Sequence, residues 1–270
     1  MDRRPVGVFD SGVGGLTVFK ELEANLPHES LLYLGDTARV PYGTRSPDTV
    51  VRYSVEAAHF FRSHDVKMVV VACNTASSVA LPELEREAGV PVLGVIEPGA
   101  RQAVNRTRSG KIGVIGTRAT VRSSAYTRAI HAVNPDLEVL ARPCPLFVPL
   151  AEEGWTDNQV AKETAEIYLR PLLDAGVDTL VLGCTHYPLL KDVIGEVAGD
   201  GVALVDSAEA VSVAVREQLT TTKKLLASRD DAVPRHRFFV TDAPEPFHDA
   251  AKRFLGRSLD HLELVEIAGE

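Results

Sequence analysis

Two cysteines occur in closely similar settings. The apolar run 69–72 (VVVA) ends at Cys73, and the run 180–183 (LVLG) ends at Cys184. Small polar residues follow each cysteine: Asn74 and Thr75 after the first, Thr185 after the second. A continuous run of β-branched and apolar residues predicts a buried parallel strand, here one that ends at a thiol where a helix begins. Two thiols in matching settings suggest one site built from two halves.

A thiolate can act as a nucleophile, a metal ligand, a redox partner or a base, and each role makes a different demand. Zinc could use both cysteines with Asp10 and His186, but the short spacing usual for zinc ligands is missing. A disulfide belongs to an oxidising compartment, which the odd number of cysteines, three, does not favour. A single nucleophilic cysteine would need only one such setting. The remaining alternative is that both cysteines are small core residues with no chemical role.

Two equivalent thiols suit a reaction with two equivalent faces. One thiol would remove a proton from a carbon, and the other would return a proton to the opposite face. The helix start expected beside each cysteine favours the thiolate. Asp10 and His186 are candidates to orient the thiols or exchange protons with them. Neutral hydrogen bonds to a polar anionic substrate could come from Ser11, Asn74, Thr75 and Thr185.

The elements that carry these residues alternate between strands and helices. Strand 6–9, a glycine-rich turn from Asp10 to Gly15 and a helical pattern after it form a β-α opening, and 111–116 begins a similar one. Thr117 and Thr120 there take the place of Ser11 and the glycines. We predict two pseudo-symmetric, doubly wound α/β domains with mostly parallel sheets and the site in the cleft between them. The predicted domains are 1–97 with 207–270, and 98–206.

Further positions follow from local patterns. Ser46 before Pro47 predicts a helix start, and Asp157 and Ser207 are the other predicted caps. The loop 35–43 follows a strand, so its Asp36 and Tyr42 can lie at the same sheet edge as Asp10. Glu152 belongs to an acidic pair that is usually solvated.

Bulk properties narrow the function classes. The chain has 270 residues, 45% hydrophobic and 24% charged, which is the composition of an ordinary globular protein. Its net charge of −8 argues against a nucleic-acid backbone as a partner. No apolar stretch approaches the roughly 18 residues of a membrane span. We therefore expect a cytoplasmic protein that contacts neither nucleic acid nor membrane.

Several of these motifs together resemble the glutamate racemases of the aspartate/glutamate racemase family. The resemblance covers residues 6 to about 206, and the order and spacing of its motifs agree. It is carried by 9–18 (FDSGVGGLTV), 35–37 (GDT) with 41–43 (PYG), 72–77 (ACNTAS), 94–99 (GVIEPG) and 183–190 (GCTHYPLL).

The resemblance implies cofactor-independent interconversion of L- and D-glutamate, which supplies D-glutamate for peptidoglycan. It implies that Cys73 deprotonates the D-isomer and Cys184 the L-isomer, assisted by Asp10, His186 and Glu152. The substrate contacts it implies are Asp10, Ser11, Tyr42, Gly43, Asn74, Thr75, Thr117, Thr120, Thr185 and His186. We also expect a homodimer. The alternatives are a racemase for aspartate or another acidic amino acid, a non-catalytic amino-acid-binding regulator, and a metal-dependent enzyme.

Overall fold

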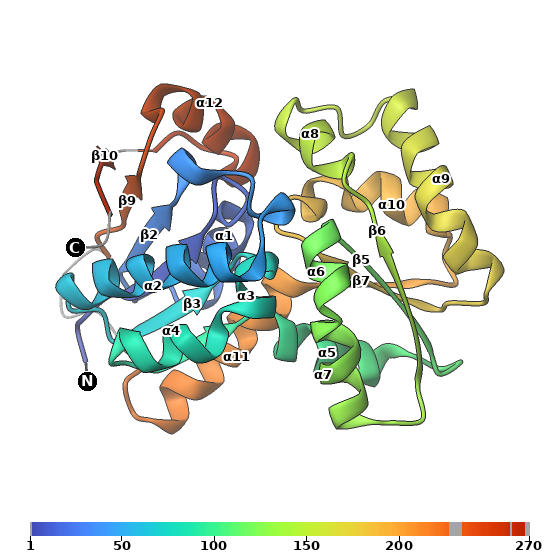
Figure 1. Ribbon diagram of the computed structural model, residues 1–270, viewed down its shortest axis with the longest axis horizontal. Coiled ribbons are helices and arrows are strands. Elements are labelled where there is room, and N and C mark those ends of the chain that lie inside the picture. The colour runs from blue at the N-terminus through green and yellow to red at the C-terminus, as the bar shows by residue number, and fades with distance from the viewer. Residues whose placement is uncertain (1, 227–233, 260, 268–270) are drawn as a thin grey trace.

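The computed structural model describes residues 2–226, 234–259 and 261–267, which form two α/β units side by side (Figure 1). Every strand pairing within the two sheets is parallel. The predicted fold class, α/β with two mostly parallel sheets, is confirmed.

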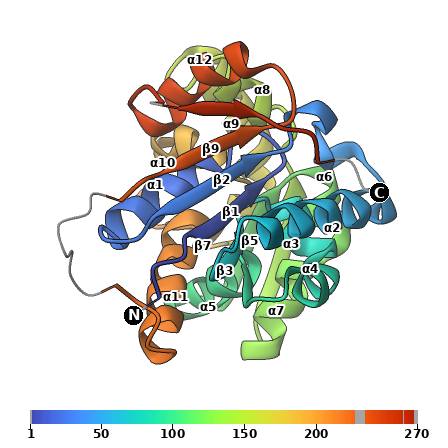
Figure 2. The same cartoon turned by 90° about the vertical axis from the view of Figure 1, so that its left-hand side faces the viewer.

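The first sheet has six strands in the order β10-β9-β2-β1-β3-β4. Their bounds are β1 (Val6–Asp10), β2 (Leu31–Gly35), β3 (Met68–Val71), β4 (Val92–Gly94), β9 (Arg237–Val240) and β10 (Leu262–Leu264). Helices cover both of its faces, as Figure 2 shows. The helices that belong to this unit are α1 (Leu16–Asn25), α2 (Pro47–Ser63), α3 (Asn74–Val79), α4 (Leu81–Ala88), α11 (Ser207–Thr221) and α12 (Pro244–Leu255).

The second sheet has four strands in the order β6-β5-β7-β8. They are β5 (Lys111–Gly116), β6 (Glu138–Pro143), β7 (Thr179–Gly183) and β8 (Ala203–Asp206). The helices of this unit are α5 (Ile96–Arg106), α6 (Arg118–Ser123), α7 (Ala125–Val133), α8 (Phe147–Glu152), α9 (Gln159–Asp174) and α10 (Lys191–Ala198). Short 3-10 turns occur at Thr37–Arg39, Tyr42–Thr44 and Tyr187–Leu190.

The two sheets share a topology. The order β6-β5-β7-β8 repeats β2-β1-β3-β4 with each number raised by four. Strands β3 and β7, which precede Cys73 and Cys184, are therefore topological equivalents, and so are β1 and β5. The near-duplication inferred from the two cysteine motifs has a structural basis.

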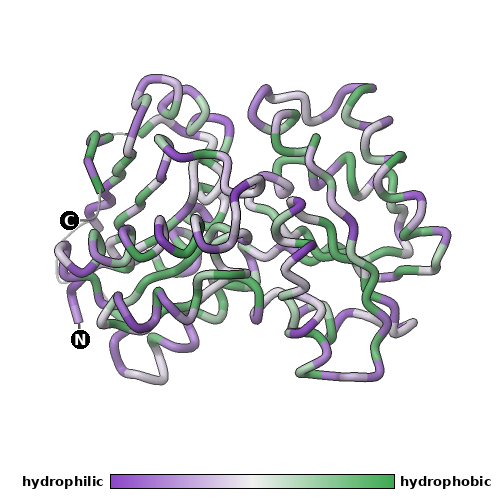
Figure 3. The backbone as a smooth tube through the Cα atoms, viewed as in Figure 1, coloured by the Kyte–Doolittle hydropathy of each residue, from purple (hydrophilic) through white to green (hydrophobic). Residues whose placement is uncertain are grey.

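The strands are buried on both faces because their residues are apolar without interruption. In β3, Met68 and Val70 belong to the core on one side of the first sheet, and Val69 and Val71 belong to the core on the other. This alternation is the two-residue period of a strand buried from both sides. Figure 3 shows the hydrophobic residues concentrated along the strands and the hydrophilic ones on the outer helices and loops.

Two predicted helix caps lie one residue from the observed ones. The side chain of Asn158, not Asp157, caps α9, and that of Asp206, not Ser207, caps α11. The expected Ser46 cap with Pro47 at the start of α2 is confirmed. In both cases the neighbouring residue is also a favoured capping type, so the sequence alone could not distinguish the two candidates for the cap.

The domain boundaries remain a proposal. Strands between residues 6 and 94 share the first sheet with those between 237 and 264, and strands between 111 and 206 form the second. Helix α5 begins at Ile96, just before the proposed boundary, and α11 begins at Ser207, directly after the other one. Residues 1, 227–233, 260 and 268–270 of the first proposed domain lie outside the described residues.

Candidate active site

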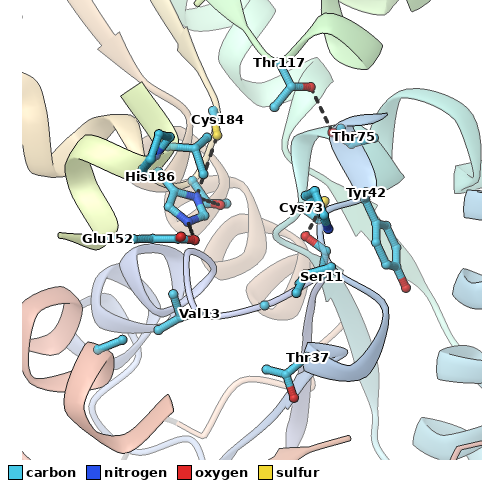
Figure 4. Close-up of a pocket in the computed structure, with 18 of the residues that line it drawn as sticks. Ser11, Val13, Thr37, Tyr42, Cys73, Thr75, Thr117, Glu152, Cys184 and His186 are labelled. Carbon is cyan, nitrogen blue, oxygen red and sulfur yellow. Dashed lines mark hydrogen bonds and ion pairs between the residues drawn. The ribbon is translucent and has the colours of Figure 1, made fainter. Parts of the chain in front are cut away.

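Both cysteines open onto one cavity of about 530 Å³ between the two units. Figure 4 shows Cys73 and Cys184 on opposite walls of this cavity. Strands β3 and β7 hold equivalent positions in their two parallel sheets, so their carboxyl ends bring the two thiols to facing sheet edges. The predicted site residues that line the cavity are Ser11, Tyr42, Gly43, Cys73, Asn74, Thr75, Thr117, Glu152, Cys184, Thr185 and His186. Asp10 and Thr120 are buried behind its wall.

Cys73 is a buried thiol at the start of α3. Its Sγ accepts a hydrogen bond from the main-chain N–H of Ala76 at 3.4 Å and donates one to Ser11 Oγ at 3.5 Å. Burial first, and then the nearby Asp10 carboxylate, raise the pKa of Cys73 to about 12, against the opposite effect of these hydrogen bonds. The hydrogen bond from Ala76 at the helix start lowers this pKa, as expected, but desolvation outweighs it and favours the neutral thiol.

Asp10 lies at the end of β1 beneath the glycine-rich loop. Its Oδ2 accepts a hydrogen bond from the N–H of Gly12 at 2.9 Å, and its Oδ1 is buried without a partner among the described residues. Burial raises the pKa of Asp10, opposed mainly by the charge of His186. The carboxyl group can therefore hold or release a proton next to the wall that carries Cys73.

Cys184 faces a different set of groups. Its Sγ lies 3.8 Å from Nδ1 of His186, whose Nε2 lies 2.9 Å from Oε1 of Glu152 at the end of α8. Burial alone would lower the pKa of His186, but the interactions with Cys184 and Glu152 outweigh it and raise that pKa to about 10. These two interactions therefore favour the cationic form of the imidazole. Cys184 is followed by a 3-10 turn and then α10, so the α-helix expected directly after it is displaced.

Three threonine hydroxyls meet where the two units touch. Thr75 Oγ1 lies 3.1 Å from Thr117 Oγ1 (Figure 4). Thr120 Oγ1 lies 3.4 Å from Thr75 Oγ1 and 3.0 Å from Thr117 Oγ1. Thr117 also caps α6 by accepting from the N–H of Thr120. The equivalence of Thr117 and Ser11 inferred from the sequence corresponds to their positions after β5 and β1.

The loop after β2 brings Tyr42 and Gly43 to the cavity, but the Tyr42 hydroxyl points away from it (Figure 4). That hydroxyl donates to the fully buried carboxylate of Asp36. Asp36 also accepts from Arg39 Nε at 2.7 Å and Thr241 Oγ1 at 2.9 Å. The Tyr42 hydroxyl thus fixes the loop. The groups that the loop presents to the cavity are its main chain and the face of the Tyr42 ring.

Sequence reasoning missed one wall of the cavity. Helix α12 contributes Phe247, Ala250 and Arg253, and further lining comes from Val13, Val40, Arg118, Val148 and Pro149. Helix α12 follows strand β9 in the chain. Because β9 runs parallel to β2, its carboxyl end lies at the edge that carries the site. A parallel pairing of this strand with the first sheet would therefore have placed α12, which follows it, at the wall of the cavity.

Among the described residues, no three His, Cys, Asp or Glu side chains lie together so that they could hold a metal ion. No described helix combines the length and the apolar character that a bilayer crossing requires.

Comparison with known proteins gives consistent matches. Residues 13–215 match the family model described as Asp/Glu/Hydantoin racemase. A glutamate racemase of Geobacter metallireducens is 56% identical over 270 residues, covering 100% of this chain and 99% of that protein. One from Neisseria meningitidis serogroup A is 48% identical, covering 98% of this chain and 97% of that protein. A crystal structure of glutamate racemase from Francisella tularensis in complex with D-glutamate matches with a TM-score of 0.92 at 39% identity, covering 99% of both chains.

Proposed function

The chain belongs to the Asp/Glu/hydantoin racemase family, and we propose that it is a glutamate racemase that interconverts L- and D-glutamate with two thiols and no cofactor. One cysteine, as thiolate, removes the α-proton, and the electron pair left behind is delocalised into the adjacent carboxylate. The other cysteine, as thiol, returns its own proton to the opposite face. The reaction therefore leaves the two sulfurs in exchanged protonation states.

The observation that carries the proposal is that Cys73 and Cys184 face one cavity from the ends of equivalent strands. The deprotonated α-carbon is planar, so a thiol on each wall can reach one of its two faces. The full-length similarity to glutamate racemases, one of them crystallised with D-glutamate, supports the choice of substrate.

We assign each wall to one enantiomer, with Cys73 deprotonating D-glutamate and Cys184 deprotonating L-glutamate. The cationic His186 can donate a hydrogen bond to the Cys184 sulfur, and Glu152 orients its ring. Asp10 serves the Cys73 wall, where its charge disfavours the thiolate. The ammonium group of a bound amino acid would offset that charge and make the thiolate more accessible.

The substrate carboxylates meet mostly neutral donors. We propose that these are the hydroxyls of Ser11, Thr75, Thr117, Thr120 and Thr185, the amide of Asn74 and the main chain at Tyr42 and Gly43. Neutral donors hold an anion without cancelling its charge, and the hydroxyls of Ser11, Thr75, Thr117 and Thr120 are already oriented by the contacts described above.

The proposal is tested by hydrogen exchange. L-glutamate incubated with the protein in D2O, without pyridoxal phosphate, should exchange its α-hydrogen and lose its optical rotation. Cys73→Ala and Cys184→Ala should each reduce racemisation by at least about a hundredfold, since positioned acid–base groups contribute 10² to 10⁴. Exchange that survives replacement of both cysteines would refute the assignment.

The same assay distinguishes the alternatives. Faster turnover of L-aspartate than of L-glutamate would identify the protein as an aspartate racemase. The two rates must be compared directly, because one methylene more or less in the substrate changes the rate by only about 10- to 200-fold. Saturable glutamate binding without any exchange would indicate a non-catalytic regulator.

We further propose a cytoplasmic homodimer that supplies D-glutamate for peptidoglycan and contacts neither nucleic acid nor membrane. Three free buried cysteines suit a reducing compartment. The side chains of Leu146, Trp155 and Val160, each about half exposed, lie around one apolar groove and give a surface that a second copy could cover. The molar mass from light scattering during gel filtration tests the dimer.

A further inference from the structure

A tyrosine of the second unit holds a cavity-lining amide of the first. Tyr126, at the start of α7, donates its hydroxyl proton to Oδ1 of Asn74 at 2.7 Å. Asn74 is the first residue of α3, directly after Cys73, and it lines the cavity. Both side chains are almost fully buried, with 2% of each residue exposed. The contact therefore joins the two units in a region that water hardly reaches.

The other end of the same amide has no partner. Nδ2 of Asn74 is buried and makes no hydrogen bond to the described residues. A buried N–H without an acceptor costs free energy, so it is expected to be paired when the site is filled. Because Asn74 borders the cavity, the available acceptor is an anionic group of a bound ligand.

The tyrosine also decides which way the amide faces. Burial raises the pKa of the Tyr126 hydroxyl, so this group stays protonated and donates. Its proton fixes the amide oxygen on the protein side and leaves the N–H group for the ligand. Without this donor the amide can turn over and present its oxygen, which repels a carboxylate.

The ring of Tyr126 is held where the chain crosses between the units. A Cβ added at Gly99 in α5 would lie 3.3 Å from the ring, and one at Gly183, just before Cys184, would lie 3.1 Å from it. The two glycines thus allow the ring to pack against the crossing helix and against the strand that carries the second thiol. A shift of one sheet relative to the other must therefore move the hydroxyl relative to Asn74.

We propose that Tyr126 is a positioning residue for substrate binding: it holds Asn74 with its N–H group toward a carboxylate of the amino acid. Through this bond the second unit sets a substrate contact in the first. The inference rests on the proposed function for the identity of the ligand, but the geometry requires only that the ligand be a carboxylate.

The test uses Tyr126→Phe, which keeps the ring and removes only the hydroxyl. We expect the calorimetric Kd and the KM for glutamate to rise roughly tenfold, while kcat changes less than about threefold, because a binding contact and not a reacting group is lost. Tyr168→Phe is the matched control. The Tyr168 hydroxyl accepts from the N–H of Leu146 and does not line the cavity, so its removal should leave Kd, KM and kcat unchanged.

A double-mutant cycle separates positioning from general packing. If Tyr126 acts through Asn74, Tyr126→Phe should have almost no effect on Kd in an Asn74→Ala background. An unchanged Kd in Tyr126→Phe, or the same loss in both backgrounds, would overturn the proposal. If the wild type binds glutamate without exchanging its α-hydrogen, the proposed function fails while the Kd values still decide this inference. If the wild type does not bind glutamate at all, the proposed function fails, and the same comparison of Kd values with L-aspartate decides this inference.

Discussion

The imidazole of His186 connects Glu152 to Cys184, with Nε2 2.9 Å from Oε1 and Nδ1 3.8 Å from Sγ. Cys73 has no such chain: its sulfur meets the Ser11 hydroxyl and a main-chain N–H, with Asp10 nearby. The two walls of the cavity thus share a topology but differ in their charged groups.

Glu152→Gln should shift the pH profile. The pKa of His186 is raised to about 10 despite burial, by Cys184 first and then by Glu152. Glutamine keeps a hydrogen bond but removes the negative charge, so the imidazolium loses its proton at lower pH. Because Glu152 is half exposed, we expect the alkaline limb of kcat/KM to move down by about one pH unit. Glu153→Gln, which lines the cavity without contacting His186, is the control, and an equal shift there would contradict the assignment.

Asp10→Asn should change the reactivity of Cys73 and the turnover in opposite directions. The pKa of Cys73 is about 12, raised by burial and then by the Asp10 carboxylate. Asparagine removes that charge, so the thiolate fraction at a given pH rises and alkylation of Cys73 by iodoacetamide becomes faster. Racemisation should fall by at least about tenfold, because a proton-handling group is lost. Peptide mapping by mass spectrometry measures the first effect; slower alkylation would show that Asp10 does not control this thiol.

Gly14→Ala should disrupt the Cys184 wall. A Cβ at Gly14 would lie 2.4 Å from Thr185 Oγ1 and 2.5 Å from His186 Nδ1, which forces both side chains to move. A displacement near 1 Å can cost about a hundredfold in rate, so we expect a kcat/KM loss of that order in a folded protein. Gly12→Ala, in the same loop, meets only Val40 Cγ1 at 3.1 Å and should be far milder. Equal losses from the two substitutions would contradict this account.

Lys67→Met should destabilise the protein. Lys67 is fully buried, and its Nζ donates to Glu29 Oε2 at 2.5 Å and to the carbonyl oxygens of Asp2 and Lys224. Removing it leaves the buried Glu29 carboxylate uncompensated, which costs about 3–5 kcal/mol of unfolding free energy. Urea denaturation measures the loss.

Lys252→Met is the matched control, because its ion pair with Asp249 is solvent-exposed and its removal should barely change the urea midpoint. The double variant Lys67→Met with Glu29→Leu should recover part of the lost stability, since no buried charge remains. A Lys67→Met midpoint equal to the wild type would show that the pair contributes little.

Local patterns were sufficient to predict the fold, and together with the family resemblance they identified part of the cavity lining. Uninterrupted apolar runs at 69–72 and 180–183 predicted buried parallel strands, and polar residues after each run predicted a shared edge. The repeated strand order explains why one motif could be used to interpret the other.

Contacts between distant segments could not be predicted in the same way. Glu152 belonged to an acidic pair that composition assigns to solvent, and only the fold of α8 brings it to His186. The electrostatics of Cys73 also depend on burial, which a helix start in the sequence does not reveal. Tyr126 had no local signal at all, because its partner Asn74 is 52 residues away.

The unlike surroundings of the two sulfurs have a thermodynamic limit. The enantiomers of glutamate are equal in free energy in water. The Haldane relation therefore fixes the ratio of kcat/KM for L-glutamate to kcat/KM for D-glutamate at unity, whichever residues surround each thiol. The imidazole–carboxylate chain on one side can make the enzyme hold one mirror image more tightly and release it more slowly. A substitution on either wall must nevertheless change both specificity constants by the same factor, even when it changes the individual KM values unequally.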